Sequence, residues 1–255
     1  MRPTPVAHQT VRSGWASNGG VRLHYVEGGG DDASGGAVLV VPGFGELARE
    51  YTWLIESLAP RRVVAADLRG RGPSDVPASG YDLDDHVNDL ETVVETAGLR
   101  EFTVIAISRG TSYGLGYALR HPERVRGFLA GDYGAVHLAL PETWPAEALT
   151  RVLRGVPIPE RIAPHAVRAL QREAAERQMW DRLGELRSPF FVVRGTRRSV
   201  LVSEEMVDRY RAALPEVEIH TLEGLGHDLW NPDHRPLLGL VESLLKHAWG
   251  VRQGG

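Results

Sequence analysis

One stretch constrains the fold of this chain more than any other. An apolar, β-branched run at 103–107 meets Ser108, and helix-forming residues then continue to residue 120. Small residues, Ala106 and Gly110, stand two positions before and after the serine. A sharp turn between a buried strand and a helix strains the backbone of its central residue and leaves little room for bulky neighbours. The stretch therefore predicts a nucleophile elbow, with an ordinary helix N-cap as the alternative for the serine.

Strand and helix patterns alternate along the rest of the chain. Strands are expected at 11–17, 21–26, 37–41, 62–66, 103–107, 125–130, 190–193 and 217–222. Helices are expected at 50–58, 83–97, 204–214 and 237–249, besides the one after the serine. This alternation predicts an α/β protein with a mostly parallel, doubly wound sheet.

The character of the chain changes between 137 and 186. Prolines separate short helical pieces there, and no strand pattern is apparent. We therefore expect a core formed by 1–136 and 187–255, with a helical lid at 137–186. Residues 1–9 are expected to be a loose tail.

Composition narrows the class of protein. The 255 residues are 42% hydrophobic and 24% charged, as in soluble globular proteins of one large domain. The net charge of −4, without a basic run, gives no reason to expect nucleic acid or an anionic membrane as a partner. The absence of cysteine excludes disulfides and thiolate metal sites. No signal-peptide core or membrane-spanning stretch is apparent, so we expect a cytoplasmic monomer or homodimer.

Four motifs together carry a resemblance. They are the loop Val41-Pro42-Gly43-Phe44-Gly45, the loop Asp67 to Ser74, the pentad Ala106 to Gly110 followed by Ala118 to Val125, and the loop Gly224-Leu225-Gly226-His227. In this order the chain resembles the α/β-hydrolase fold family from about Val21 onward. The resemblance implies an eight-stranded sheet with a short helical lid after the sixth strand. Two positions depart from the family pattern, since Pro42 replaces a histidine and Ala106 replaces a glycine.

A serine needs a base to remove its proton as it attacks. His227 is the candidate because the glycines before it place it in a tight loop after a strand, and a solvent-facing loop histidine is the alternative. By resemblance, the backbone N–H groups of Phe44 and Arg109 form the oxyanion hole.

The carboxylate that should orient the histidine is missing from its usual place. The segment 195–202 contains no acidic residue, and Glu204 and Glu205 are expected in the first turn of a helix capped by Ser203. Asp132, at the end of the strand after the elbow helix, is the candidate acid, similar to the fungal zearalenone-lactone hydrolases. Alternatively, Asp132 is a loop cap and the triad is incomplete.

Further side chains are candidates for substrate contact. The Arg109 guanidinium either binds a carboxylate or carbonyl of the substrate or forms an ion pair with Asp132 or Glu46. Four more candidates line the pocket or simply pack within the lid: Tyr133, His137, Trp144 and Trp180.

The sequence thus predicts a serine hydrolase that cleaves an ester or lactone of a small to medium organic molecule, without a metal or organic cofactor. One alternative is another chemistry of the same fold, such as C–C bond hydrolysis, perhydrolysis or biosynthetic cyclisation. The other is a ligand-binding or signalling relative without catalysis.

Overall fold

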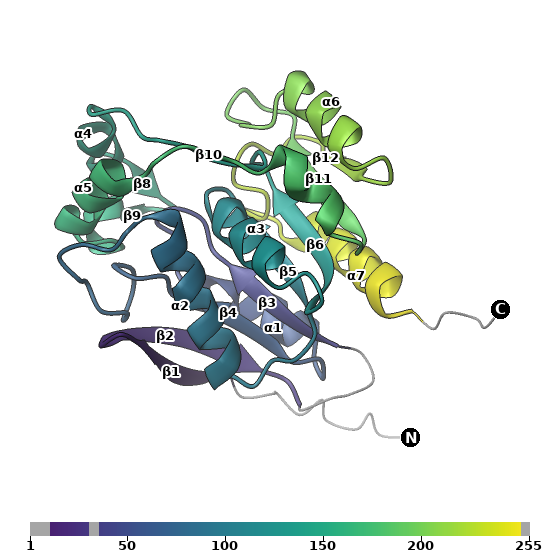
Figure 1. Ribbon diagram of the computed structural model, residues 1–255, viewed down its shortest axis with the longest axis horizontal. Helices are drawn as coiled ribbons and strands as arrows, with labels where there is room; N and C mark the ends of the chain where they lie inside the picture. Colours follow the sequence, from purple (N-terminus) through teal and green to yellow (C-terminus); the bar gives the residue numbers. More distant parts are fainter. Residues whose placement is uncertain (1–10, 31–35, 251–255) are drawn as a thin grey trace.

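A sheet of eight strands runs through the centre of the molecule in a computed structural model that describes residues 11–30 and 36–250 (Figure 1). Its spatial order is β1-β2-β4-β3-β5-β6-β11-β12. The strands are β1 (Arg12–Asn18), β2 (Val21–Gly28), β3 (Ala37–Val41), β4 (Val63–Ala66), β5 (Phe102–Ile107), β6 (Val125–Gly131), β11 (Phe190–Gly195) and β12 (Glu218–Leu222). The pairs β1–β2 and β2–β4 are antiparallel, and all pairs from β4 to β12 are parallel.

Local sequence explains where these strands form. Gly19 and Gly20 both have positive φ, which permits the tight turn between β1 and β2. The central strands β3 and β5 are apolar runs buried on both faces, as parallel strands covered by helices require.

Helices cover both faces of the sheet (Figure 1). On one side lie α2 (Leu83–Thr96) and α3 (Gly110–Arg120), whose buried side chains share one apolar cluster with the sheet. On the other side, α1 (Thr52–Ser57) and α7 (Arg235–Trp249) belong to a second cluster. The α/β-hydrolase fold is thereby confirmed, with α6 (Glu204–Ala213) between β11 and β12.

The segment between β6 and β11 consists of short elements (Figure 1). Its helices are α4 (Trp144–Leu149), η2 (Ile158–Glu160), α5 (Pro164–Glu173) and η3 (Trp180–Glu185). Its strands are β7 (Val136–His137), β8 (Val152–Leu153), β9 (Val156–Pro157) and β10 (Arg177–Gln178), so the expectation of no strands there is wrong. Two-residue pairs are too short to give the alternating pattern that identifies a strand from sequence. A separate small apolar cluster joins α4, η2 and α5. Its function as a lid stays a prediction.

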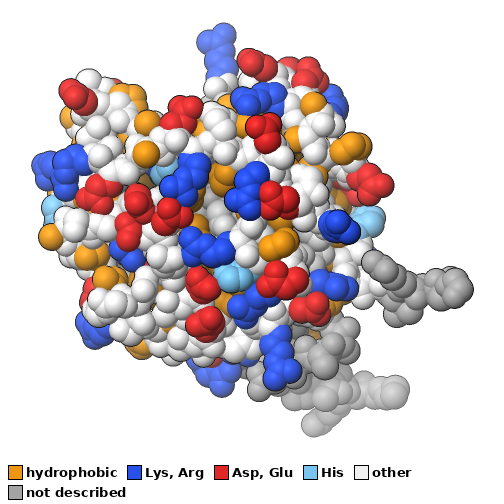
Figure 2. Space-filling view, viewed as in Figure 1, with side chains coloured by type: hydrophobic (Ala, Val, Ile, Leu, Met, Phe, Trp, Pro, Cys, Tyr) orange, Lys and Arg blue, Asp and Glu red, His pale blue; other side chains and the backbone are white. Residues whose placement is uncertain are grey.

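Predicted and observed elements otherwise differ mainly at their ends. The helix expected at 50–58 is a 3-10 turn, η1 (Ala48–Tyr51), followed by α1. The tail expected at 1–9 lies outside the described residues. Among the described residues, no helix is long and apolar enough to cross a membrane. Figure 2 shows acidic and basic side chains interspersed on one face rather than gathered into a single-sign patch.

Candidate active site

Ser108 occupies a strained turn between β5 and α3. Its φ of 52° lies in the left-handed region, which L-residues other than glycine rarely adopt. The Ser108 N–H donates to the Gly131 carbonyl at 2.6 Å, which ties the turn to the end of β6. A Cβ at Gly110 would lie 2.4 Å from the carbonyl oxygens of Val41 and Pro42. Glycine is therefore required there, because the loop after β3 passes against the start of α3.

Ala106 fits where the family usually has glycine because the helix above it provides the space. A Cβ at Gly114 of α3 would lie 3.1 Å from the Cβ of Ala106 and 3.3 Å from Val104. The strand therefore has the methyl group and the helix has the glycine. This packing explains why alanine can replace the glycine of the family pattern.

The structure brings Ser108, His227 and Asp132 together from three distant parts of the chain. His227 Nε2 lies 2.8 Å from Ser108 Oγ, and His227 Nδ1 lies 2.7 Å from Asp132 Oδ2. The His227 side chain is 34% exposed, whereas that of Asp132 is fully buried. One ring nitrogen therefore faces the serine while the other is held by a carboxylate, the arrangement that serine activation requires.

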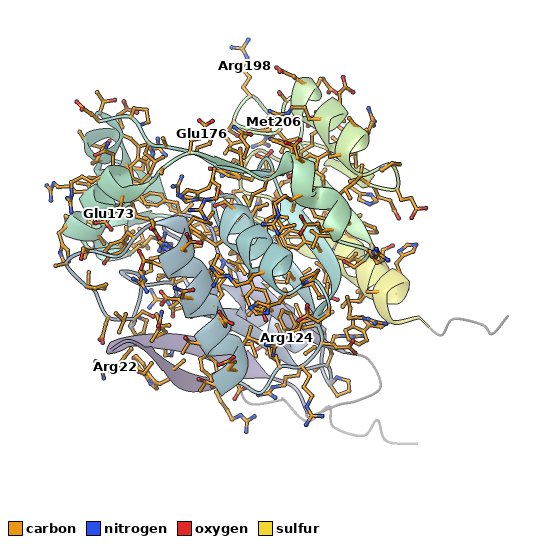
Figure 3. The ribbon with its side chains drawn as sticks, viewed as in Figure 1. Arg22, Arg124, Glu173, Glu176, Arg198 and Met206 are labelled. Atoms are coloured by element: carbon orange, nitrogen blue, oxygen red, sulfur yellow. The ribbon has the colours of Figure 1, made fainter. Side chains whose placement is uncertain are left out.

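The segment 195–202, which contains no acidic residue, holds the candidate acid Asp132 in place. The backbone N–H groups of Leu201 and Val202 donate to the two Asp132 carboxylate oxygens at 2.9 and 3.0 Å. Asp132 itself has a φ of 48°, a conformation that aspartate and asparagine tolerate better than most residues. The side chain of Arg198, in the same segment, points away from the molecule (Figure 3). Because backbone N–H groups hold Asp132, no pattern of side chains in the sequence could have identified these contacts.

Glu204 and Glu205, which follow this segment, lie where they were expected, in the first turn of a helix. Ser203 caps α6 by accepting a hydrogen bond from the Met206 N–H, and Glu204 and Glu205 lie in the first turn. Glu204 is exposed and pairs with Arg194 at 2.5 Å, not with His227.

The loop after β3 lies against the serine. A Cβ at Gly43 would be 2.9 Å from the Ser108 Cβ, so this backbone approaches the candidate nucleophile closely. Within the described ranges, the N–H groups of Phe44 and Arg109 donate no hydrogen bond. Two such donors beside the serine are what an oxyanion hole needs.

The contacts of Arg109 differ from the predicted ion pairs. Its guanidinium donates to the Tyr113 hydroxyl at 3.1 Å, to His137 Nε2 at 3.0 Å and to the Leu138 carbonyl at 3.1 Å. Asp132 is held by His227 and backbone N–H groups instead, and Glu46 by a different arginine. All described hydrogen-bond partners of this buried guanidinium are thus neutral groups.

His137 and Tyr133 lie beside Arg109 as parts of one buried network. His137 Nδ1 contacts the Ser112 hydroxyl at 3.0 Å. Burial, followed by the neighbouring positive charges of Arg109 and Arg177, lowers the pKa of His137 to about 3, so this imidazole is neutral. Burial also raises the pKa of Tyr133, whose hydroxyl the Arg109 guanidinium contacts.

The two candidate tryptophans lie in different parts of the molecule. The Trp144 ring packs edge-on against Phe44, with ring centroids 4.8 Å apart, so it lies at the candidate site. Trp180 packs instead against Tyr210 at 4.8 Å, with the guanidinium of Arg209 4.3 Å from its ring. It belongs to the main apolar cluster, and its assignment as a pocket residue stays a prediction. Its position in the 137–186 segment did not reveal that η3 returns to the sheet.

A second chain of serine, histidine and aspartate lies far from the elbow in sequence and was not predicted. Ser13 Oγ is 3.0 Å from His24 Nε2, and His24 Nδ1 is 2.7 Å from Asp67 Oδ2. Asp67 also accepts the Ala48 N–H at 2.8 Å, so it joins neighbouring loops. Ser13, however, lies inside the regular strand β1, without the sharp turn and helix N-terminus that Ser108 has. This contrast provides an internal control for serine activation.

The two loops of the site are bound by an arginine that sequence reasoning also missed. Arg154, between β8 and β9, pairs with Glu46 and with Asp228, each at 2.6 Å. Within the described part of the chain, no three histidine, aspartate or glutamate side chains are placed to hold a metal ion.

Comparison with known proteins agrees with this architecture. A family model described as the alpha/beta hydrolase fold matches residues 36–148. The chain is 34% identical over 134 residues to a cis-3-alkyl-4-alkyloxetan-2-one decarboxylase of Shewanella oneidensis, covering 51% of this chain and 40% of that protein. It is also 34% identical over 116 residues to a haloalkane dehalogenase of Psychrobacter cryohalolentis, covering 44% and 38%.

A solved structure extends the likeness over most of the chain. The enol-lactonase of Burkholderia xenovorans superposes with a TM-score of 0.76 at 17% identity, covering 91% of this chain and all of that one. The sequence matches span less than half the length of the two curated relatives, so they support the fold rather than a shared reaction. The order of the strands, the serine turn after β5 and these matches agree, and the chain has the α/β-hydrolase fold.

Proposed function

We propose that the protein is a serine hydrolase that cleaves an ester or lactone of a small to medium organic molecule through an acyl-enzyme. The observation that carries this proposal is the continuous contact from Ser108 Oγ to His227 Nε2 at 2.8 Å and from His227 Nδ1 to Asp132 at 2.7 Å.

Each residue has a defined task in this reaction. Ser108 Oγ attacks the carbonyl carbon while His227 Nε2 takes its proton, and the carbonyl oxygen becomes negative. The N–H groups of Phe44 and Arg109 stabilise that charge at the N-terminus of α3. The bond to the leaving oxygen then breaks, and His227 returns the proton to it. Water, activated by His227, attacks the acyl carbon and releases the carboxylic acid and Ser108.

The identity of the nucleophile favours acyl substrates over epoxides and alkyl halides. A hydroxyl that attacks an epoxide or alkyl halide forms an ether, which has no carbonyl carbon for water to attack. A hydroxyl that attacks an ester or lactone forms another ester, which water can hydrolyse. The names of two similar proteins agree with this class, because an oxetan-2-one is a four-membered lactone and the structural neighbour is an enol-lactonase.

Arg109 is a candidate to extend recognition to acidic substrates. Its guanidinium has only neutral partners among the described residues, so a substrate carboxylate would be the first negative charge to contact it. Tyr133, His137 and Trp144 would then lie near the same substrate.

A fluorophosphonate probe and a panel of neutral and carboxylate-bearing esters and lactones test the proposal. We expect wild type to be labelled at Ser108 and to hydrolyse members of the panel. Ser108→Ala should abolish both labelling and turnover, whereas Ser13→Ala should leave both unchanged because Ser13 lies in a regular strand.

The alternatives give different results. Folded wild-type protein that is neither labelled nor active on any member of the panel would contradict the hydrolase assignment. Tight binding of a panel compound without turnover would instead favour a ligand-binding protein. Labelling that survives Ser108→Ala but disappears in Ser13→Ala would move the activated serine to β1.

A further inference from the structure

Arg154 lies in the segment between β6 and β11. Among the described residues of that segment, it is the one whose side chain contacts both loop 42–46 and loop 224–228 of the candidate site. Its Nη2 donates to Glu46 Oε1 and to Asp228 Oδ1, both at 2.6 Å. Its Nε donates to Asp228 Oδ2 at 2.9 Å, and its guanidinium carbon lies 3.6 Å from the centre of the Trp230 ring. The side chain is only 10% exposed, so these charges interact with little screening by water.

Arg154 Nη1 also lies 3.4 Å from Glu50 Oε1, and the other two acidic partners, Glu46 and Asp228, are directly connected to residues of the site. Glu46 Oε2 accepts the Gly43 N–H at 2.7 Å and the Tyr51 hydroxyl at 2.6 Å, which fixes the loop that carries the Phe44 amide. Asp228 immediately follows His227. Arg154 therefore connects the loop of one candidate oxyanion donor with the loop of the candidate base.

The backbone at Arg154 indicates that its side chain is needed. Val152–Leu153 pairs with Val156–Pro157, and the two-residue connection, Arg154 and Gly155, has positive φ at both positions. Asparagine and glycine suit such a hairpin turn best, whereas arginine is strained at a φ of 50°. Strain of this kind persists where surrounding contacts compensate for it.

We propose that Arg154 is a positioning residue for the hydrolase reaction: it holds loop 42–46 and loop 224–228 in the relative placement that aligns the Phe44 amide, Ser108 and His227. Without it, Glu46 and Asp228 would face each other as two carboxylates that now share one nitrogen. Their repulsion would separate the two loops. This inference rests on the function proposed above.

The decisive variant is Arg154→Asn, because asparagine favours the turn and removes only the charged contacts. The matched control is Arg151→Asn, which changes an exposed arginine three residues earlier. Fluorophosphonate titration counts the competent serines, so that kcat can be expressed per titrated site. Hydrogen–deuterium exchange reports separately on loops 42–46 and 224–228.

We expect Arg154→Asn to lower kcat per titrated serine by about 10- to 100-fold, with KM for a small ester within about threefold, since misplaced catalytic groups slow the chemical step more than binding. Exchange should rise in both loops. Adding Asp228→Asn should recover about fivefold or more by removing the repulsion, and Arg154→Lys should fall between wild type and Arg154→Asn. Arg151→Asn should match wild type.

Unchanged kcat per titrated serine, or unchanged exchange in the two loops, would overturn the positioning role. A loss confined to the number of titratable sites would do the same, because it would mean that Arg154 only supports folding. If wild type is neither labelled nor active, the hydrolase proposal fails, and the exchange measurement still decides whether Arg154 holds the loops.

Discussion

Asp132 occupies the position in which the proposed triad needs its carboxylate. Its side chain is buried at the end of β6, and three N–H donors converge on it, from His227, Leu201 and Val202. The loop after β11 supplies two of these donors through its backbone. Strands β6 and β11 end at the same edge of the sheet, so a carboxylate at the end of β6 reaches the same histidine as one placed after β11 would.

Asp132→Asn tests this assignment of the acid. Asparagine tolerates the left-handed backbone at this position, so the fold should persist. It offers one acceptor oxygen to three donors and no negative charge, and His227 would no longer be held in the required tautomer. We expect kcat for an ester to fall by about 10³- to 10⁴-fold with little change in KM. Steady-state kinetics, with circular dichroism to verify folding, would measure this.

Glu204→Gln is the matched control, because it removes an exposed carboxylate from the place nearest to where the family usually has its acid. It should keep wild-type kcat. If Glu204→Gln loses activity and Asp132→Asn does not, the assignment of the acid is wrong.

At the scale of elements, the packing of β5 against α3 determines how the serine turn is built. The Ala106 methyl group faces the bare Cα of Gly114, and Val104 and Phe128 fill the remaining space around that glycine. Strand and helix approach closely only if one of the two positions lacks a side chain. Glycine at 106 or glycine at 114 would each satisfy this condition.

Gly114→Ala should therefore destabilise the protein by about 1–3 kcal/mol, because its new Cβ would lie 3.1 Å from that of Ala106 in a close-packed core. Ala106→Gly in the same chain should reduce this loss. We expect the two substitutions to be non-additive by about 0.5 kcal/mol or more in urea unfolding. Strict additivity would show that the two methyl groups do not compete for the same space.

The sequence could predict the elements and the candidate residues, but not the contacts that depend on how distant segments fold together. Strand and helix patterns placed the eight strands. The turn pattern identified Ser108, the glycine loop identified His227, and Asp132 was a candidate from its position at a strand end and from the family resemblance. The donors from Leu201 and Val202 are backbone groups, and the role of Arg154 depends on how a hairpin folds back onto two loops. Such contacts leave no local pattern. The burial of Trp180 likewise depends on how η3 packs against the core.

At the scale of the whole molecule, two buried cations lie near the site without a carboxylate. Within the described ranges, neither Arg71 nor Arg109 has an acidic side chain at ion-pair distance. Both contact imidazoles, with Arg71 3.3 Å from His86 Nε2 and Arg109 3.0 Å from His137 Nε2. Positive charge and burial together disfavour the protonation of these histidines, and the pKa of His86 lies well below its usual range.

This arrangement makes stability depend on pH in a defined direction. Folded His137 stays neutral down to about pH 3, because burial, Arg109 and Arg177 lower its pKa, whereas in the unfolded chain it takes up a proton near pH 6.5. The unfolded state thus binds more protons between these values, and the free energy of unfolding falls as the pH falls.

His137→Gln should remove its part of this slope while an amide oxygen still accepts from Arg109. Urea unfolding gives the free energy of unfolding at pH 7 and at pH 5. Between these two pH values, the free energy should fall by about 2 kcal/mol less in His137→Gln than in wild type. His165→Gln changes an exposed imidazole and should keep the wild-type slope. Equal slopes for wild type and His137→Gln would mean that His137 is protonated in the folded state, and the Arg109 guanidinium would then need a different acceptor.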